Sequence, residues 1–293
     1  MTTPIASGPP PVTPPPALSP GARTAIRVAL IALSGALITG LVVALSGAAW
    51  GLSSLRVVKD SATLPTSLTS VTVDTGSVPA AVRITTDREV REPRVDMRMV
   101  NSTRAGSEPL SVTADGTDAQ VTIDAEPSEL LQWTRAGEVT VVLPPELARR
   151  VSVTTRQETG VLFAQADIDR LTARTVDGAV IVSGSARRVD ITNEHGDVTT
   201  RGPITVDESF SATTTTGDIS VKFAAPPATV DAHSEHGDVV VSLPPPGPYF
   251  VDASGTEHGE TVVKVPTTRD RDSAASAITA RSETGDIVVN EAN

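Results

Sequence analysis

The segment TTTTGDISV, residues 213–221, places an alternating stretch on each side of a Gly-Asp pair. Related phrases recur along the second half of the chain, and their glycines are 18, 18, 21, 20, 22 and 26 residues apart. The recurring glycines are Gly160, Gly178, Gly196, Gly217, Gly237, Gly259 and Gly285. A period of about 20 residues is typical of repeats that bury their apolar faces by stacking, because one repeat alone cannot do so. The phrase therefore predicts a stack of similar units.

Apolar residues alternate with polar ones on both sides of each glycine. Seven positions before it stand Val153, Leu171, Val189, Phe210, Val230, Asp252 and Ile278, and two positions after it stand Leu162, Val180, Val198, Ile219, Val239, Thr261 and Ile287. The sixth repeat carries one extra residue, Gly255, between its apolar position and its glycine. Val251, eight residues before Gly259, therefore takes the apolar position instead of Asp252. A period of two predicts strands. Because Gly can adopt a positive φ and Asp bonds to nearby backbone N–H groups, the pair predicts a tight turn between two strands.

The composition favours a narrow core. Seven of the 293 residues are aromatic, too few to fill a thick globular interior. Small β-branched side chains can close a thin solenoid instead, with neighbouring strands about 4.8 Å apart. Short strands at regular spacing also fit a β-sandwich, but a sequence repeated in the same phase favours stacked coils. We therefore predict an all-β, repeat-built β-solenoid or β-helix-like domain over residues 66–293, preceded by one transmembrane α-helix.

Three parts of this repeat region carry a family resemblance. They are Val139–Pro145 followed by Val151–Thr155 and Gly160, then Thr213–Val221, then Arg281–Val289. These segments resemble the bacterial putative-adhesin β-strand repeat family. The resemblance extends from about Ser70 to the C-terminus and is strongest after Glu138. It implies a membrane-tethered or secreted β-repeat domain whose molecular function is undetermined, and it supplies no catalytic or ligand residue to carry over.

The first 65 residues have a different composition. Residues 1–27 are rich in proline, which predicts a disordered tail, and we favour a solvated tail over a docking motif at Pro11 and Pro14. Residues 28–55 contain no charged side chain and are long enough to cross a hydrocarbon core of about 30 Å. This predicts a transmembrane helix over 28–55 and a short stalk over 56–65.

The flanking charges leave the orientation of the span open. Arg23 and Arg27 precede it, and Arg56 and Lys59 follow it. A single early span usually leaves the N-terminus in the cytoplasm, so we expect a cytoplasmic tail, a single-pass protein of the cell membrane and an exported β domain. The alternative is a cleaved signal peptide, for which Ser46–Ala48 offers small residues near a cut. The long apolar run and the long segment before it favour the uncleaved anchor.

Charge and cysteine content restrict the partners. After Lys59 the chain has 20 basic and 35 acidic residues, a net charge of −15, which disfavours nucleic acid and anionic lipid. The absence of Cys excludes disulfides, thiol catalysis and Cys-ligated zinc. The expected partners are the membrane and an envelope polymer or a protein. The small residues Ala36, Gly40 and Ala44 would let a second copy pack closely against the helix, but small residues are common in membrane spans, and we favour that explanation.

Three of the repeated turns contain histidine before the glycine, namely His195, His236 and His258. If successive repeats stack in register, His236 and His258 lie about 5 Å apart, and Asp238 and Glu260 could complete a transition-metal site. Polar turn residues copied by duplication explain the same pattern, and the repeat at Thr216 interrupts any histidine column. We therefore expect no metal site and no cofactor.

Carboxylates follow the glycine in most repeats. They are Asp197, Asp218, Asp238, Glu260 and Asp286. A column of stacked carboxylates would repel unless a cation or solvent screened it, which makes Ca²⁺ a hypothesis. The tight spacing of calcium-binding nonapeptide repeats is absent, so we interpret these residues as turn residues.

Enzyme motifs are missing from the sequence. It contains no P-loop, no His-Glu-x-x-His, no Gly-x-Ser-x-Gly and no dinucleotide fingerprint, and we expect no catalytic activity. Two functions remain. The first is a membrane-anchored, surface-exposed binding or adhesion-type module that contacts an envelope polymer or another cell through its Thr/Ser/Asp-rich faces. The second is an envelope structural or regulatory protein that works by self-association or through a membrane partner.

Overall fold

The computed structural model describes residues 33–35, 37–43, 55–102, 109–123, 137–255 and 259–292. The chain divides into two units, residues 1–54 and 55–293. In the first unit, residues 33–35 and 37–43 are helical. Across the described part of the chain, no helix has the length and apolar character needed to span a membrane.

Several sequence-based expectations fall wholly or partly outside the described residues. They concern the tail at 1–27, much of the helix expected at 28–55, the small residues Ala36 and Ala44, the alternative cleavage region at 46–48, and His258.

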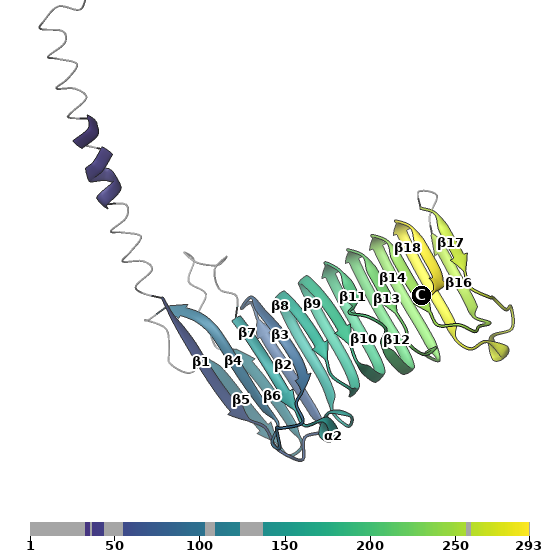
Figure 1. Cartoon of the computed structure of the whole chain (residues 1–293), viewed down its shortest axis with the longest axis horizontal. Coiled ribbons are helices and arrows are strands. Elements are labelled where there is room, and N and C mark those ends of the chain that lie inside the picture. Colours follow the sequence, from purple (N-terminus) through teal and green to yellow (C-terminus); the bar gives the residue numbers. More distant parts are fainter. Residues whose placement is uncertain are drawn as a thin grey trace, which may run out of the picture. The chain divides into compact units, whose positions relative to one another are not determined.

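The second unit is a stack of coils (Figure 1). In the coils after residue 151, the chain passes a repeated glycine between a first and a second stretch of strand. Neighbouring coils pair in parallel. In stacking order the coils are β6 (Asp118–Ile123) with β7 (Gly137–Leu143), β2 (Ser70–Gly76) with β3 (Ala80–Thr86), β8 (Ser152–Gln165), β9 (Ile168–Ser183), β10 (Ser185–His195) with β11 (Val198–Thr200), β12 (Thr205–Thr216) with β13 (Ile219–Lys222), β14 (Thr229–His236) with β15 (Val239–Leu243), β18 (Ala277–Thr284) with β19 (Ile287–Glu291), and β16 (Phe250–Gly255) with β17 (Thr261–Lys264).

The register of these pairs confirms the predicted repeat. The apolar residues placed seven before each glycine form one continuous buried column, which passes through Val153, Leu171, Val189, Phe210, Val230 and Ile278. Val251 is paired with Ile278, as the extra residue in the sixth repeat predicts. Parallel pairing of successive repeats in one phase distinguishes the stack from a β-sandwich, whose sheets are antiparallel.

The coils do not stack in chain order at either end. The coil β2–β3 lies between β6–β7 and β8, and β18–β19 lies between β14–β15 and β16–β17. The apolar content of the repeats explains the second exchange. β18 and β19 bury Ile278, Ile287 and Val289, whereas β17 has Thr261 and Val263 at the corresponding inner positions. The more apolar repeat therefore occupies the place where both of its sides are covered.

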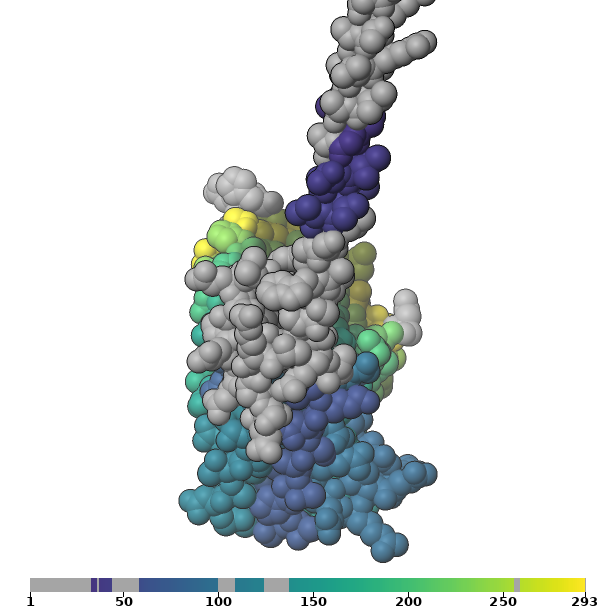
Figure 2. All heavy atoms as spheres, turned by 90° about the vertical axis from the view of Figure 1, so that its left-hand side faces the viewer, coloured from purple at the N-terminus to yellow at the C-terminus, as the bar shows by residue number. Residues whose placement is uncertain are grey.

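The N-terminal end of the stack is closed by antiparallel strands. β5 (Leu110–Asp115) pairs with β6, β4 (Arg94–Ser102) pairs with β7, and β1 (Leu55–Thr63) pairs with β4. Met97 and Met99 of β4 are buried there. Blue and teal chain from this half of the unit is visible in the end-on view of Figure 2. The stalk expected at residues 56–65 is thus wrong, because β1 is hydrogen-bonded to the sheet; Leu64 is also buried against the core. The expectation that this half covers the end of the stack is confirmed.

One short helix, α2 (Pro145–Ala148), joins β7 to β8, and a 3-10 turn, η2 (Arg271–Ser273), precedes β18.

Candidate functional site

The repeated glycines lie in one column at the turn edge of the stack. A Cβ atom on Gly178 would lie 1.7 Å from the carbonyl oxygen of Gly160, and one on Gly196 would lie 1.9 Å from that of Gly178. The same close approach continues through Gly217, Gly237, Gly285 and Gly259, in that order. Each carbonyl occupies the space of the next residue's side chain, so that only Gly fits. The repeated glycine is therefore a requirement of stacking.

Polar side chains three residues before these glycines point into the stack and bond to it. Each donates to the backbone carbonyl of the adjoining coil at the glycine column. The bonds run from Gln157 to Ala80 (3.0 Å), from Asn193 to Gly178 (2.9 Å), from Thr214 to Gly196 (3.2 Å), from Ser234 to Gly217 (2.9 Å) and from Ser282 to Gly237 (2.8 Å). All five donors are buried. This inner column satisfies carbonyl groups that would otherwise lie unpaired in the interior.

The carboxylates that follow the glycines form a second column, on the outside of the same edge. Each carboxylate accepts a hydrogen bond from the backbone N–H of the next carboxylate residue. Asp218 donates to Asp197 (3.0 Å), Asp238 to Asp218 (2.8 Å), Asp286 to Asp238 (2.8 Å) and Glu260 to Asp286 (2.8 Å). A charged acceptor strengthens such bonds. The carboxylate column therefore links the coils, and these hydrogen bonds explain why a carboxylate residue follows the glycine in successive repeats.

Replacing Asp218 by Ala tests this column. The variant loses the acceptor of the Asp238 N–H, and we expect the free energy of unfolding to fall by about 1–2 kcal/mol. Asp207→Ala on β12 removes the same charge from an exposed side chain that makes no hydrogen bond or ion pair among the described residues. It should change stability by less than about 0.5 kcal/mol. Urea unfolding followed by circular dichroism measures both. Equal stabilities for the two variants would contradict the assigned role of Asp218.

The histidines of the turns do not gather. His236 lies in register with Thr284, and its Nδ1 is 2.8 Å from the Thr284 hydroxyl. His258 lies outside the described residues, but the coil that carries Gly285 lies between those of Gly237 and Gly259, so the turns of these two repeats are not adjacent. His195 lies 3.4 Å from Asp177 on the preceding coil. In the described part of the chain, no group of three or more His, Asp and Glu side chains could hold a metal ion.

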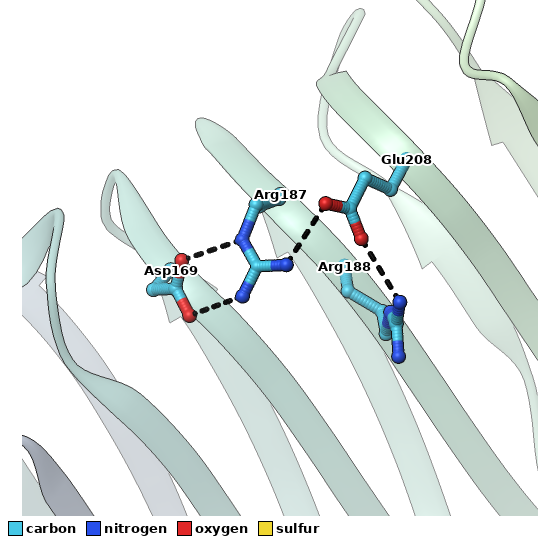
Figure 3. Close-up of polar contacts among 4 residues, drawn as sticks. All are labelled: Asp169, Arg187, Arg188 and Glu208. Carbon is cyan, nitrogen blue, oxygen red and sulfur yellow. Dashed lines mark hydrogen bonds and ion pairs between the residues drawn. The ribbon is translucent and has the colours of Figure 1, made fainter.

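An ionic network crosses three coils on the exposed side of the first strands (Figure 3). Arg187 binds both carboxylate oxygens of Asp169 at 2.9 Å and reaches Glu208 at 2.9 Å, and Glu208 also accepts from Arg188 at 2.9 Å. The hydrogen bonds from Arg187 lower the pKa of the Asp169 carboxyl below its ordinary value, and those from Arg187 and Arg188 lower the pKa of Glu208. The same bonds to Asp169 raise the pKa of Arg187. The network favours the charged forms of Asp169, Arg187 and Glu208.

This network predicts a dependence of stability on pH. A carboxyl whose pKa is lowered by folding stabilises the protein above its unfolded pKa, and the stabilisation is lost as the pH falls through the folded pKa. The unfolded value for Asp169 is near 3.8. Arg187→Gln should therefore lower the melting temperature at pH 7, and the difference from the parent protein should shrink below pH 3.8. Melting curves between pH 7 and pH 2.5 test this. A difference that stays constant over this range would contradict it.

The outward-facing side chains of β8, β9, β10, β12, β14 and β18 form a broad surface, which we call the hydroxyl face. In one row across these strands stand Thr154, Thr172, Asp190, Ser211, Asp231 and Thr279, and in the next stand Arg156, Arg174, Thr192, Thr213, His233 and Arg281. These residues alternate with the buried ones and are themselves partly or fully exposed. Since the strands are parallel and in register, neighbouring residues within each row lie about 4.8 Å apart.

Two further strands, β2 beside β8 and β16 beside β18, continue the pattern on either side. β2 contributes Thr72 and Asp74, and β16 contributes Asp252 and Ser254. The hollows beside the face are open and carry both signs of charge; one of them is lined by Arg156, Arg174 and Glu194. The arrangement offers hydrogen-bond donors and acceptors in a regular grid.

The fold and the polar face define a class of protein: a parallel β-solenoid whose turns contain Gly and Asp and whose flat face is polar. Residues 68–290 match the family Toastrack DUF4097, and the chain belongs to that family. This agrees with the resemblance seen in the sequence. No curated protein matches the chain.

Solved structures of low identity are also similar. A putative adhesin from Parabacteroides distasonis shares 8% identity, with a TM-score of 0.47, over 80% of this chain and 97% of that one. A putative adhesin from Bacteroides fragilis shares 9% identity, with a TM-score of 0.39, over 81% and 97%. A putative lipid binding protein from Parabacteroides distasonis shares 10% identity, with a TM-score of 0.32, over 80% and 97%.

Proposed function

We propose that this protein is a membrane-anchored, non-catalytic binding module that presents the hydroxyl face to a polymer of the cell envelope. The observation that carries the proposal is the register of that face. Hydroxyl, carboxylate and guanidinium groups repeat from strand to strand at nearly constant spacing. A polymer with many similar hydroxyl or charged groups can make the same contact at several strands, so that weak single contacts add up to retention.

The composition of the face favours a polar ligand. The central strands carry short, exposed or partly exposed hydroxyl side chains at Thr172, Ser211 and Thr213. None of the three forms a side-chain hydrogen bond within the described chain. Aromatic platforms for stacking are scarce, since the chain has seven aromatic residues and Phe210 and Phe223 are buried. Recognition would therefore rest on hydrogen bonds and charge, and the net charge of −15 after Lys59 disfavours nucleic acid.

Anchoring by the N-terminal unit is part of the proposal. Residues 28–55 carry no charge, and the described helical residues within them expose large apolar side chains, among them Leu37 with 66% of its surface accessible. Such surface is costly in water, and lipid would cover it. We infer a tail in the cytoplasm and a β unit outside. Protease added to intact cells should then remove the β unit and spare the tail, and protection of the β unit would contradict this orientation.

Retention of the full-length protein on purified cell-wall polymer tests the binding role. Thr172→Ala/Ser211→Ala removes two hydroxyls from the hydroxyl face and should weaken retention several-fold, because the removed groups lie at its centre. Thr199→Ala/Ser220→Ala removes two hydroxyls from the outward side of the second strands and should leave retention unchanged. If the parent protein is not retained, or if both pairs of substitutions act alike, the proposed face is wrong.

A further inference from the structure

The two ends of the stack differ in how they are covered. The N-terminal end carries the antiparallel strands β4, β5 and β1, with Met97 and Met99 buried beneath them. At the other end, β16 pairs with β18 and β17 with β19, and in the described residues no strand pairs with their outer edges. Val263, at an inner position of β17, is 39% exposed, whereas its register partner Val289 is fully buried. The C-terminal coil therefore leaves both backbone and apolar surface open.

An open edge of this kind readily pairs with another strand. Repeat proteins need a terminal cover, because the last coil has an apolar side with no neighbour. The first end of this stack has such a cover. At the second end, the segment after β17 covers the start of β16, where Tyr249 pairs with Thr267 and Arg271 lies over the Phe250 ring, but no described strand covers β17.

The charges on β17 favour a second copy of the same strand. Glu260 and Lys264 lie two residues on either side of Val262, so that all three side chains face outward along one row. Both charged side chains are exposed, and neither forms an ion pair within the described chain. On the neighbouring edge strand, Asp252 is 3.8 Å from Arg281 of its own chain, so its charge is already partnered.

We propose that two copies of this protein associate end to end, with β17 antiparallel to β17 of the second copy and with Val262 at the two-fold axis. Antiparallel pairing around Val262 places Glu260 opposite Lys264 of the second copy and Lys264 opposite its Glu260, so that one interaction occurs twice. Thr261 and Val263 then meet on the inner side and cover the open end of the core. Opposite charges directly across an antiparallel pair stabilise it, and like charges destabilise it.

A different reading of Lys264 makes the opposite prediction. A lysine on an edge strand can also prevent edge-to-edge pairing. In that case the protein stays monomeric at every concentration, and removal of the charge increases association. Charge reversal separates the two cases, because a self-complementary pair can be exchanged and restored.

The test measures self-association of the full-length protein in detergent by sedimentation. Lys264→Glu creates two Glu–Glu contacts and Glu260→Lys creates two Lys–Lys contacts, so that each single variant should raise the dimer dissociation constant at least about tenfold. The double variant Glu260→Lys/Lys264→Glu restores two opposite-charge pairs and should return the constant to within about threefold of the parent value. A monomeric parent protein, unaffected single variants, or a double variant as weak as the singles would each overturn the proposal.

A cysteine substitution locates the interface independently of any association through the N-terminal unit. The chain has no cysteine, so one introduced thiol can pair only with its counterpart in another copy. Val262→Cys should form a disulfide-linked dimer under mild oxidation, since the two side chains meet at the axis. Val240→Cys is the matched control, in the same outward row but on β15, which is paired on both sides. Equal cross-linking of the two variants would contradict the assigned interface, and equal circular dichroism spectra would establish that both are folded.

Discussion

Replacing Gly178 by Ala should cost at least about 3 kcal/mol of unfolding free energy, one of the two largest effects that we expect from single substitutions. The new Cβ would lie 1.7 Å from the carbonyl oxygen of Gly160, and the contacted atom belongs to a backbone that is paired in the sheet. The coils on both sides of the turn would have to separate. Gly178 also has a φ of 157°, which L residues rarely adopt. Urea unfolding of the purified protein measures the loss.

Gly202→Ala is the control for backbone conformation. Gly202 has a φ of 80°, but no heavy atom lies within 4 Å of the site where its Cβ would be. The substitution should therefore cost only the conformational strain, about 1–2 kcal/mol. If Gly178→Ala were no more destabilising than Gly202→Ala, close approach of the coils would not be the reason for the repeated glycine.

Replacing Phe210 by Ala should cost about 3–5 kcal/mol, because it leaves a cavity in the centre of the stack. Phe210 is fully buried, and its ring meets that of Phe223 edge to face with 5.4 Å between the centroids. The narrow core between the strands contains few other large side chains that could shift to fill the space. The expected result is a lower urea midpoint with an unchanged slope of unfolding free energy against urea.

Phe163→Ala is the matched control. Phe163 faces outward from β8, and its ring lies 4.9 Å from the guanidinium carbon of Arg83. Its removal loses a surface cation–π contact and should cost about 0.5–1 kcal/mol. A similar loss for both phenylalanines would contradict the assignment of Phe210 to the core and Phe163 to the surface.

The stacked architecture could be predicted from the sequence because its physical cause repeats. Each coil from β8 onward needs an apolar residue at the same inner position and a glycine at the same turn, so that Val153, Gly160 and their counterparts recur in phase. The extra residue in the sixth repeat could also be located, since Val251 and Asp252 differ in polarity. A further signal was present and was missed. The buried donors Asn193, Thr214 and Ser234 all stand three residues before a glycine, where a polar residue on an inner position marks a hydrogen-bonding role.

The order of the coils could not be predicted in the same way. Nothing in a single repeat specifies which neighbour it takes, and chain order suggested that the coil of Gly259 follows that of Gly237. The difference in apolar content between the two repeats, in which Thr261 stands opposite Ile287, is the physical reason for the exchange. The exchange also places the coil of Gly285 between those of Gly237 and Gly259, so that the two turns whose proximity the metal hypothesis assumed are not adjacent.

The ionic network was likewise missed. Asp169, Arg187 and Glu208 stand on three coils, each nine residues before a repeated glycine, so the repeat spacing and the alternation of charge were a signal that was overlooked. Their contact follows from the register of the coils, which the sequence alone specifies only approximately. The same holds for the hydroxyl face, whose Ser and Thr residues were recognised as exposed but whose rows depend on the pairing of the strands.

The order of the coils underlies the assigned turn chemistry, the open C-terminal edge and the extent of the hydroxyl face, and paired cysteines test it most directly. His233 is paired with Arg281 of β18, and Arg281 in turn with Ser254 of β16. Adjacent strands lie about 4.8 Å apart, within reach of a disulfide, whereas strands two coils apart are roughly 10 Å apart and out of reach. The double variant His233→Cys/Arg281→Cys should form an intramolecular disulfide, and His233→Cys/Ser254→Cys should not. The reverse result, with the bond between positions 233 and 254, would show that the coils stack in chain order and would contradict the account.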